Sequence, residues 1–285
     1  MMNIKKRIFT LSCIVILGTG ILLAVHLFST QSEKKEKLAV LLTKYKKERS
    51  YSLMWKEDFK KVSLNPNIWQ KIKRKATAWA CHMSDDTSLY QLKNGYLRLY
   101  CKRNTNKNDT ARVITGGITT EHKQGITYGK VEVKARLKGA MGCWPAIWLV
   151  NNGYGLNDPR WAEIDIIERY NHDQKVVMTA HNYYGTMLKK ESEQERNVTI
   201  NVKPEDWNIY AVEVLPNCLI FSVNNVPVKI YERKENIVGQ FPYEDKKYLR
   251  IDMQWGNPWL KDLREHELPA FMDIDWVKFY RIKKI

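Results

Sequence analysis

Residues 161–170 read WAEIDIIERY, and the spacing of three carboxylic acids in this segment decides how it must fold. Successive side chains of a β-strand point to opposite faces, so Glu163 and Asp165, two positions apart, share one face. Glu168 is five positions from Glu163 and would fall on the other face of a regular strand. A β-bulge adds one residue without advancing the register of the strand. We therefore predict a bulged strand that carries all three acids on a single face.

The bulge also predicts the separation of two of these acids and the direction of the isoleucines between them. It places Glu168 effectively four steps from Glu163, which separates their Cα atoms by roughly 13 Å. Two glutamate side chains that reach toward each other would then leave about 5 Å between the carboxyl groups, the separation used by retaining glycosidases. Ile164 and Ile166 should pack into the core behind the acids.

Cleavage of a glycosidic bond needs one carboxylic acid that protonates the leaving oxygen and one carboxylate that attacks or activates water. Asp165, beside Glu163, would share a proton or a hydrogen bond with it, which sets its orientation and pKa. Glu168 would have to start protonated, so its neighbours should raise its pKa. From spacing alone, two other interpretations stay open: an exposed acidic strand face, and a site for calcium or another metal ion.

The rest of the chain predicts an all-β protein. With 285 residues, 44% of them hydrophobic and 27% charged, the chain is long enough for a large globular domain with a proper core. From residue 53 onward, short alternating runs recur between turn residues, as in YLRLYCK (96–102), KVEVKARL (130–137) and WNIYAVEV (207–214). No long stretch there has helical periodicity. We expect two large stacked sheets in one domain, residues 51–285.

The first 50 residues have a different composition. Residues 1–30 combine a basic start, MMNIKKR, with about 21 largely apolar residues, long enough to span a bilayer. They predict a signal peptide or, as we prefer, an uncleaved signal anchor with the domain outside; a lipoprotein signal at Cys13 is a further alternative. Residues 31–50, rich in Lys and Glu, predict a charged tether or short helix. We therefore expect an exported domain, at the cell surface or in the periplasm, that contacts the membrane only through its N-terminal segment.

The formal net charge is +16, of which residues 1–50 carry +7. A basic surface suits nucleic acid, an anionic membrane or an acidic polysaccharide. The sequence has no zinc finger, base-reading basic helix or RNA-binding motif, so nucleic acid is not an expected partner.

Four cysteines, Cys81, Cys101, Cys143 and Cys218, follow the N-terminal segment. They form no CxxC pair and no Cys/His ligand spacing, which argues against a zinc site. Two disulfides in an oxidising compartment and small buried thiols both remain open.

The chain resembles glycoside hydrolase family 16. The run EIDIIE matches that family's bulged E-x-D-x-x-E signature, and residues 116–150 and 248–281 are similar to its stretches before the catalytic strand and at the end of the domain. The resemblance implies a β-jelly-roll sandwich of the concanavalin A-like type with a concave substrate cleft. It also implies that Glu163 is the nucleophile, that Asp165 assists it and that Glu168 is the acid/base.

The resemblance also indicates a substrate class. WACHMSDD (79–86) and ERYNHD (168–173) resemble endo-β-galactosidases of gut bacteria that cut poly-N-acetyllactosamine in mucin O-glycans. We therefore expect a retaining endo-β-glycosidase acting on β-galactosidic linkages of host-type O-glycans. A laminarinase-like endo-β-1,3(4)-glucanase, a transglycosylase and a carbohydrate-binding module without turnover are the alternatives. The chain departs from the family at Leu215, where Trp is frequent, and at residues 223–225, VNN in place of VDG, which affects subsite detail.

Sugar rings present a face of C–H groups that lies well on an aromatic plane. The candidate stacking residues, in CWPAIW and QWGNPW, are Trp144, Trp148, Trp255 and Trp259. Trp148 also fits a buried strand, whereas we expect Trp144 and Trp255, beside Pro and Gly, to line the cleft. Trp161 leads into the predicted catalytic strand and could form the floor beside Glu163.

Three polar residues complete the predicted site. By analogy with the family, His181 lies on the strand after the catalytic one and hydrogen-bonds the sugar or Glu168. Gln254 would hydrogen-bond a hydroxyl near the cleaved bond, and His82 is a further candidate. We expect no organic cofactor and see no metal ligand set, although a structural calcium on the sandwich would fit. We expect a monomer that acts on a glycan.

Overall fold

The computed structural model describes residues 32–45, 50–151, 153–190, 192 and 194–283. The chain divides into two compact units, Met1–Glu48 and Arg49–Ile285. In the first unit, residues 32–44 of the segment predicted as a tether or short helix are α-helical. The signal peptide or anchor predicted over residues 1–30 lies outside the described residues. Among the residues described, none of the helices is long and apolar enough to cross a membrane.

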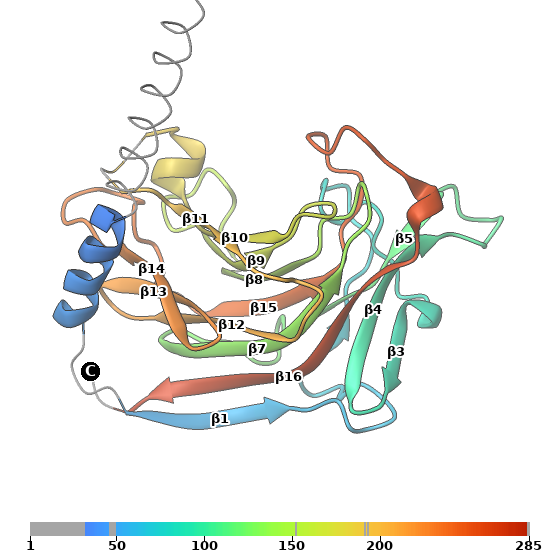
Figure 1. Cartoon of the computed structure of the whole chain (residues 1–285), viewed down its shortest axis with the longest axis horizontal. Helices are drawn as coiled ribbons and strands as arrows, with labels where there is room; N and C mark the ends of the chain where they lie inside the picture. Colours follow the sequence, from blue (N-terminus) through green and yellow to red (C-terminus); the bar gives the residue numbers. More distant parts are fainter. Residues whose placement is uncertain (1–31, 46–49, 152, 191, 193, 284–285) are drawn as a thin grey trace, which may run out of the picture. The chain divides into compact units, whose positions relative to one another are not determined.

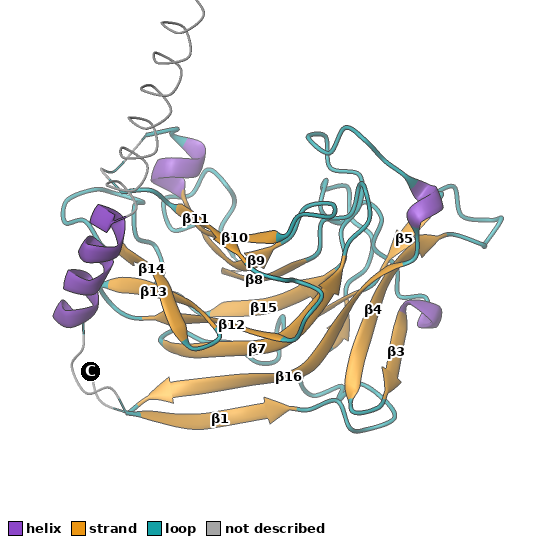
Figure 2. Cartoon of the chain, in the orientation of Figure 1, coloured by secondary structure: helices purple, strands orange, loops and turns teal. Residues whose placement is uncertain are grey.

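The second unit consists of two sheets, and the described residues place nine strands in one and seven in the other (Figures 1 and 2). The nine-stranded sheet has the order β14-β13-β12-β7-β16-β4-β3, with β1 paired to β16 and β5 paired to β4. Its strands are β1 (Tyr51–Glu57), β3 (Tyr90–Lys93), β4 (Tyr96–Arg103), β5 (Val113–Thr115), β7 (Gly129–Lys138), β12 (Asn208–Val214), β13 (Cys218–Val223), β14 (Val226–Glu232) and β16 (Ala270–Ile282).

The seven-stranded sheet has the order β11-β10-β9-β8-β15-β6-β2. Its strands are β2 (Gln70–Lys71), β6 (Gly117–Thr119), β8 (Ala146–Asn151), β9 (Ala162–Glu168), β10 (Lys175–Asn182), β11 (Asn197–Asn201) and β15 (Lys247–Asp252). Neighbouring strands are antiparallel in both sheets. The helical elements described in this unit are two 3-10 turns, η1 (Thr87–Leu89) and η3 (Glu265–Glu267), and one π-helical turn, η2 (Tyr183–Met187).

The hydrophobic core lies between the sheets, which Figure 1 shows stacked on each other. In β7, every second residue from Val131 to Leu137 is fully buried and belongs to the core. From the opposite sheet, Ile147 and Leu149 of β8 enter the same core. The apolar residues that alternate in the sequence are therefore the side chains that each strand directs into the core. The predicted all-β sandwich is confirmed.

Strand β8 is buried on both faces. Ala146, Trp148 and Val150 point away from the core and form a small apolar cluster with Trp79 on the outer face of the seven-stranded sheet. This face carries the cleft described below, so Trp148 is buried without belonging to the core between the sheets.

Within the part of the chain that the structure describes, the four cysteines of the second unit form no disulfide with one another. Cys101, Cys143 and Cys218 are fully buried, and Cys81 is half-buried. Of the two alternatives left open by the sequence, the structure has the buried thiols.

Candidate active site

Strand β9 contains the predicted bulge. Along β8, Ile147 pairs with Ile167 and the next residue, Trp148, pairs with Asp165, so Ile166 is the extra residue of β9. The pairing of β9 with β10 shifts at the same place. A residue added to one strand of a pair reverses the face on which all later side chains lie. The bulge therefore brings Glu168 back into step with the acids that precede it.

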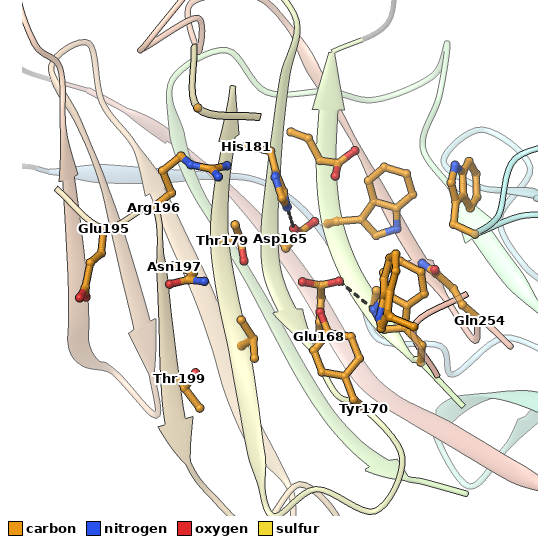
Figure 3. Close-up of a pocket in the computed structure, with 18 of the residues that line it drawn as sticks. Asp165, Glu168, Tyr170, Thr179, His181, Glu195, Arg196, Asn197, Thr199 and Gln254 are labelled. Atoms are coloured by element: carbon orange, nitrogen blue, oxygen red, sulfur yellow. Dashed lines mark hydrogen bonds and ion pairs between the residues drawn. The ribbon is translucent and has the colours of Figure 1, made fainter. Parts of the chain in front are cut away.

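As a result, Glu163, Asp165 and Glu168 all line one cleft of about 1170 Å³ on the outer face of the seven-stranded sheet (Figure 3). Ile164 and Ile166 are fully buried in the core behind them, as predicted. Asp165 and Glu168 are buried at 5% and 6% exposure, so the acids are held in the floor of the cleft and not on a solvated strand face.

His181 on β10 is the direct partner of Asp165, with Nε2 2.9 Å from Oδ2. Its Nδ1 lies 3.2 Å from Oγ1 of Thr186 in the η2 turn. The same hydroxyl oxygen accepts hydrogen bonds from Nη1 of Arg196 at 2.9 Å and from the backbone N–H of Asn182 at 3.4 Å. From the sequence we predict that His181 reaches Glu168 or the sugar; in the structure its partner is Asp165.

These contacts assign the proton of the imidazole ring. A hydroxyl has two lone pairs and one hydrogen. The N–H groups of Arg196 and Asn182 occupy the lone pairs of Thr186, so its hydrogen is left to bond Nδ1 of His181. The ring proton then sits on Nε2 and is donated to Asp165. Burial lowers the pKa of His181, which keeps the ring neutral in this arrangement.

Glu168 has a different set of neighbours. The indole Nε1–H of Trp144 donates to its Oε1 at 2.7 Å, and the Tyr170 hydroxyl faces the same carboxyl. The carboxyl of Glu168 in turn raises the pKa of Tyr170, whose burial acts in the same direction and is the larger cause. Glu168 is therefore oriented by two aromatic donors, whereas Asp165 is oriented by an imidazole.

All three acids are difficult to ionise. Burial, followed by the charge of Asp165, raises the pKa of Glu163 and of Glu168 to about 8. Burial, followed by the charge of Asp252, raises the pKa of Asp165 to about 8. Carboxyls this close titrate as a group, so at neutral pH the cluster holds fewer than three negative charges. A cluster that keeps a proton and also carries a carboxylate can supply both an acid and a nucleophile.

Glu163, Asp165 and His181 could also hold a metal ion, since each offers a ligand atom within 4.8 Å of the others. With the ring proton on Nε2, however, His181 offers Asp165 a hydrogen and not a lone pair. The arrangement therefore fits proton sharing better than metal binding. That no cofactor is needed stays a prediction.

Five of the predicted sugar contacts lie in the cleft: Trp144, Trp148, Trp259, His181 and Gln254. Trp148 is 4% exposed and donates its Nε1–H to Oδ2 of Asp252 at 2.9 Å. Gln254 donates its amide to the other oxygen of the same carboxyl at 2.8 Å. Trp259 also lines the cleft, 57% exposed, with its ring 4.9 Å from that of Trp144.

Three predicted residues are not among the residues that line this cleft. Trp255 is 4% exposed and belongs to the core, because its ring packs over Gly142, where no Cβ stands in its way. Trp161 is 6% exposed and does not line the cleft beside Glu163. His82 donates from Nδ1 to the backbone carbonyl of Val113 at 3.0 Å and is likewise outside the cleft lining.

Several residues of the cleft are not predicted from the sequence, among them Trp79, Tyr170 and Arg196. Trp79 packs edge-on against Trp148 with ring centroids 5.0 Å apart, and it comes from a loop nearly 70 positions away in the chain. Tyr170 could have been found, because it lies two positions beyond Glu168 and an extended chain returns it to the same face. Arg196 carries no sequence signal, since its place depends on the η2 turn.

The sequence of this chain is similar to a known protein family and to several characterised proteins. The sequence profile described as "Glycosyl hydrolases family 16" matches residues 75–278. A keratan-sulfate endo-1,4-beta-galactosidase from Sphingobacterium multivorum is 28% identical over 81% of this chain and 56% of its own length. The chain spans between 38% and 62% of the length of the curated relatives it matches.

Solved structures share the fold. The laminarinase from Rhodothermus marinus superimposes with a TM-score of 0.73 at 22% identity, over 84% of this chain and all of the other. A structure from a study of endo-acting O-glycanases of the human gut microbiota that initiate mucin breakdown superimposes with a TM-score of 0.68 at 24% identity, over 80% of this chain and 98% of the other. The predicted jelly-roll sandwich is thereby confirmed.

Proposed function

We propose that this chain, which belongs to glycosyl hydrolase family 16, is an exported, retaining endo-β-glycosidase that cuts β-galactosidic linkages in host-type O-glycans and poly-N-acetyllactosamine. The observation that carries the proposal is the bulge of β9, which gathers three acids of raised pKa on the floor of one cleft. The substrate class is supported by the likeness to a keratan-sulfate endo-1,4-beta-galactosidase.

In the first step, the carboxylate of Glu163 attacks the anomeric carbon and the bond to the leaving oxygen breaks. The carboxylic acid of Glu168 gives its proton to that oxygen. Burial and the charge of Asp165 raise the pKa of Glu168 and of Glu163 alike, so the acids share protons at neutral pH, and the reactive form is the one with the proton on Glu168 and the charge on Glu163. The Trp144 indole holds the Glu168 carboxyl in one orientation.

In the second step, Glu168 is a carboxylate and takes a proton from water, whose oxygen attacks the anomeric carbon and displaces Glu163. Two displacements at one carbon return the original configuration. Asp165 shares the acidic face with Glu163, and the N–H of His181 fixes the direction in which Asp165 points. Its charge tunes the ionisation of both glutamates.

A laminarinase-like endo-β-1,3(4)-glucanase is the second candidate, because a beta-glucanase from Rhodothermus marinus is 26% identical over 60% of this chain. A carbohydrate-binding module without turnover is less well supported. Three acids gathered on one cleft floor, two of them buried, repel one another and are costly to desolvate, and binding alone gives no reason to keep them together. A transglycosylase would use the same residues with a sugar in place of water.

We further propose that the N-terminal segment holds the protein at the outer face of a membrane and that it works as a monomer. The basic start and apolar run of residues 1–30 support the first proposal. Cell fractionation, with protease added to intact cells, tests it: the second unit should be cleaved from outside while a cytoplasmic marker survives.

The test of the activity uses the full chain on mucin O-glycans and laminarin in parallel, with products analysed by mass spectrometry. Oligosaccharides from mucin alone would support the endo-β-galactosidase assignment, and products from laminarin alone would transfer the chain to the glucanase class. The anomeric configuration of fresh product, followed by NMR, tests retention. Silence on both substrates and on sulfated algal galactans would contradict the enzyme assignment.

A further inference from the structure

One end of the cleft is basic. Lys189 and Lys190, which follow the η2 turn, and Arg196, just before β11, all line it, and we refer to these three residues as the basic end. In Figure 3, Arg196 lies on one side of the acids, and Gln254 lies on the other. The cleft therefore runs from an aromatic and amide wall, past three acids, to a group of cations.

Arg196 is held in a prepared position. Its Nη1 donates to Thr186, and its side chain lies directly over Gly185. A Cβ at position 185 would come within 2.4 Å of the Arg196 Nε and 2.5 Å of its Cδ. The guanidinium thus occupies space that only glycine leaves open. A freely solvated surface arginine samples many rotamers, whereas Arg196 is held in one, and this ordering costs side-chain entropy.

The positive charge of Arg196 has no carboxylate partner in the part of the chain that the structure describes. An arginine that loses part of its contact with water is stabilised by an acidic partner, and Arg196 is half-buried. Among the described residues, one of its five N–H groups has a hydrogen-bond partner, the hydroxyl of Thr186. Glu195 lines the same end of the cleft, but in Figure 3 its carboxylate points away from the Arg196 guanidinium, which points toward His181.

The two lysines of the basic end add positive charge beside Arg196. Lys189 and Lys190 are exposed and form no ion pair among the described residues. Lys189 and Arg196 both lower the pKa of His181 through their charges, which places them near the acids and not on a remote surface. Amides and hydroxyls can satisfy the hydroxyls of a neutral sugar, so three cations at one end of the cleft favour a glycan that carries an acidic group.

We propose that the basic end is a subsite for an acidic group of the glycan, in which the free guanidinium edge of Arg196 binds the oxygens of a sulfate ester or a sialic-acid carboxylate. The planar fork of an arginine matches such oxyanions with two parallel hydrogen bonds. This inference rests on the proposed function, since it assumes a glycan chain that crosses the acids of β9. It assigns the enzyme to acidic O-glycans in preference to neutral ones.

The experiment compares the full-length chain with Arg196→Gln, Arg196→Lys and the control Arg112→Gln. Arg112 is an exposed arginine outside the cleft, paired with Glu265. Each protein is assayed for kcat/KM on keratan sulfate and the same polymer after chemical desulfation, and on sialylated mucin O-glycans before and after sialidase. The two substrate pairs separate the sulfate source from the carboxylate source.

We expect the wild type to prefer one acidic substrate over its neutral form by about tenfold, the strength of a charge-assisted pair. Arg196→Gln should bring that ratio close to one, Arg196→Lys should keep part of it, and Arg112→Gln should leave it unchanged. Raising the salt concentration should reduce the ratio in the wild type. A ratio near one in the wild type, or a ratio that survives in Arg196→Gln, would overturn the inference.

A binding measurement keeps this test separate from the test of activity. In the Glu163→Gln background, calorimetry on the same glycans should show about tenfold tighter binding of the acidic form, lost when Arg196→Gln is added. If the wild type cuts none of the glycans, the proposed function fails, and the binding ratio alone then decides whether the acidic subsite exists. Equal or undetectable binding of both forms would refute it.

Discussion

The Nε2 of His181 lies 2.9 Å from Oδ2 of Asp165, and the partners of its other ring nitrogen fix the proton on Nε2. The tautomer is set outside the acid cluster, by a threonine in a π-helical turn whose lone pairs are already occupied. π-Helical turns are rare and are frequently found at functional sites. Asp165 therefore depends on a residue that does not line the cleft.

Thr186→Val should lower kcat by about tenfold with KM little changed, because the ring proton loses the hydroxyl that directs it to Nε2. Thr186→Ser keeps the hydroxyl and should restore activity. Steady-state kinetics of both variants on the preferred glycan provide the check. A valine variant as active as the serine variant would show that the tautomer has no catalytic consequence.

Glu163→Gln should abolish turnover, by at least about 1000-fold, on every substrate while binding is retained. Glu168→Gln should be equally inactive on natural glycans but should keep much of its first step on aryl glycosides with acidic leaving groups, which need no proton. Burst kinetics with such a substrate separate the two roles. If both variants respond to the leaving group alike, the assignment of nucleophile and acid is incorrect.

Trp144→Phe should move the alkaline limb of the kcat/KM profile upward by about half a pH unit to one unit. The indole N–H stabilises the charged form of Glu168, so its removal raises the pKa of that carboxyl further above its ordinary value. Because catalysis requires the protonated acid, activity should persist to higher pH. Trp259→Phe, also at the cleft but without a hydrogen bond to Glu168, should leave the limb in place.

Stability should depend on pH through the same acids. The pKa of Glu163 is raised to about 8 from an ordinary value near 4.5, so the folded protein binds a proton that the unfolded chain releases. The contribution of Glu163 to the free energy of unfolding is therefore fully present below about pH 4.5 and is lost as the pH rises toward 8. Glu163→Gln removes this loss and should be more stable than the wild type by about 1–2 kcal/mol at pH 8, with little difference at pH 4.5.

Thermal unfolding at both pH values measures this difference as a shift in Tm of a few degrees. Glu235→Gln, an exposed glutamate, serves as the control and should shift Tm little at either pH. A Glu163→Gln difference that is the same at both pH values would show that the acid does not titrate in this range.

Much of the fold and the centre of the site could be predicted, because both follow from local alternation. The out-of-step position of Glu168 required a bulge, and β9 has one at Ile166. Strands such as β7 bury every second residue, as their sequence indicates. These features depend on neighbouring positions in the chain, which is the information that a single sequence contains.

The walls of the cleft could not be predicted in the same way. Trp255 stands beside a glycine, which suggested a loop at the cleft, but Gly142 from another segment opens space for its ring in the core. Trp79 reaches Trp148 across a long stretch of chain. Such placements depend on which distant residue is small or where a turn ends. The alternation of apolar and polar residues along a strand gives no information on either.

The residue at position 185 of related sequences should indicate whether they prefer acidic glycans. Because any larger residue at this position would displace the guanidinium of Arg196, the arginine alone is not diagnostic. A related chain with the arginine and with alanine in place of Gly185 should act on neutral glycans. The joint presence of Gly185, Thr186 and Arg196 in a related sequence therefore predicts a preference for acidic glycans.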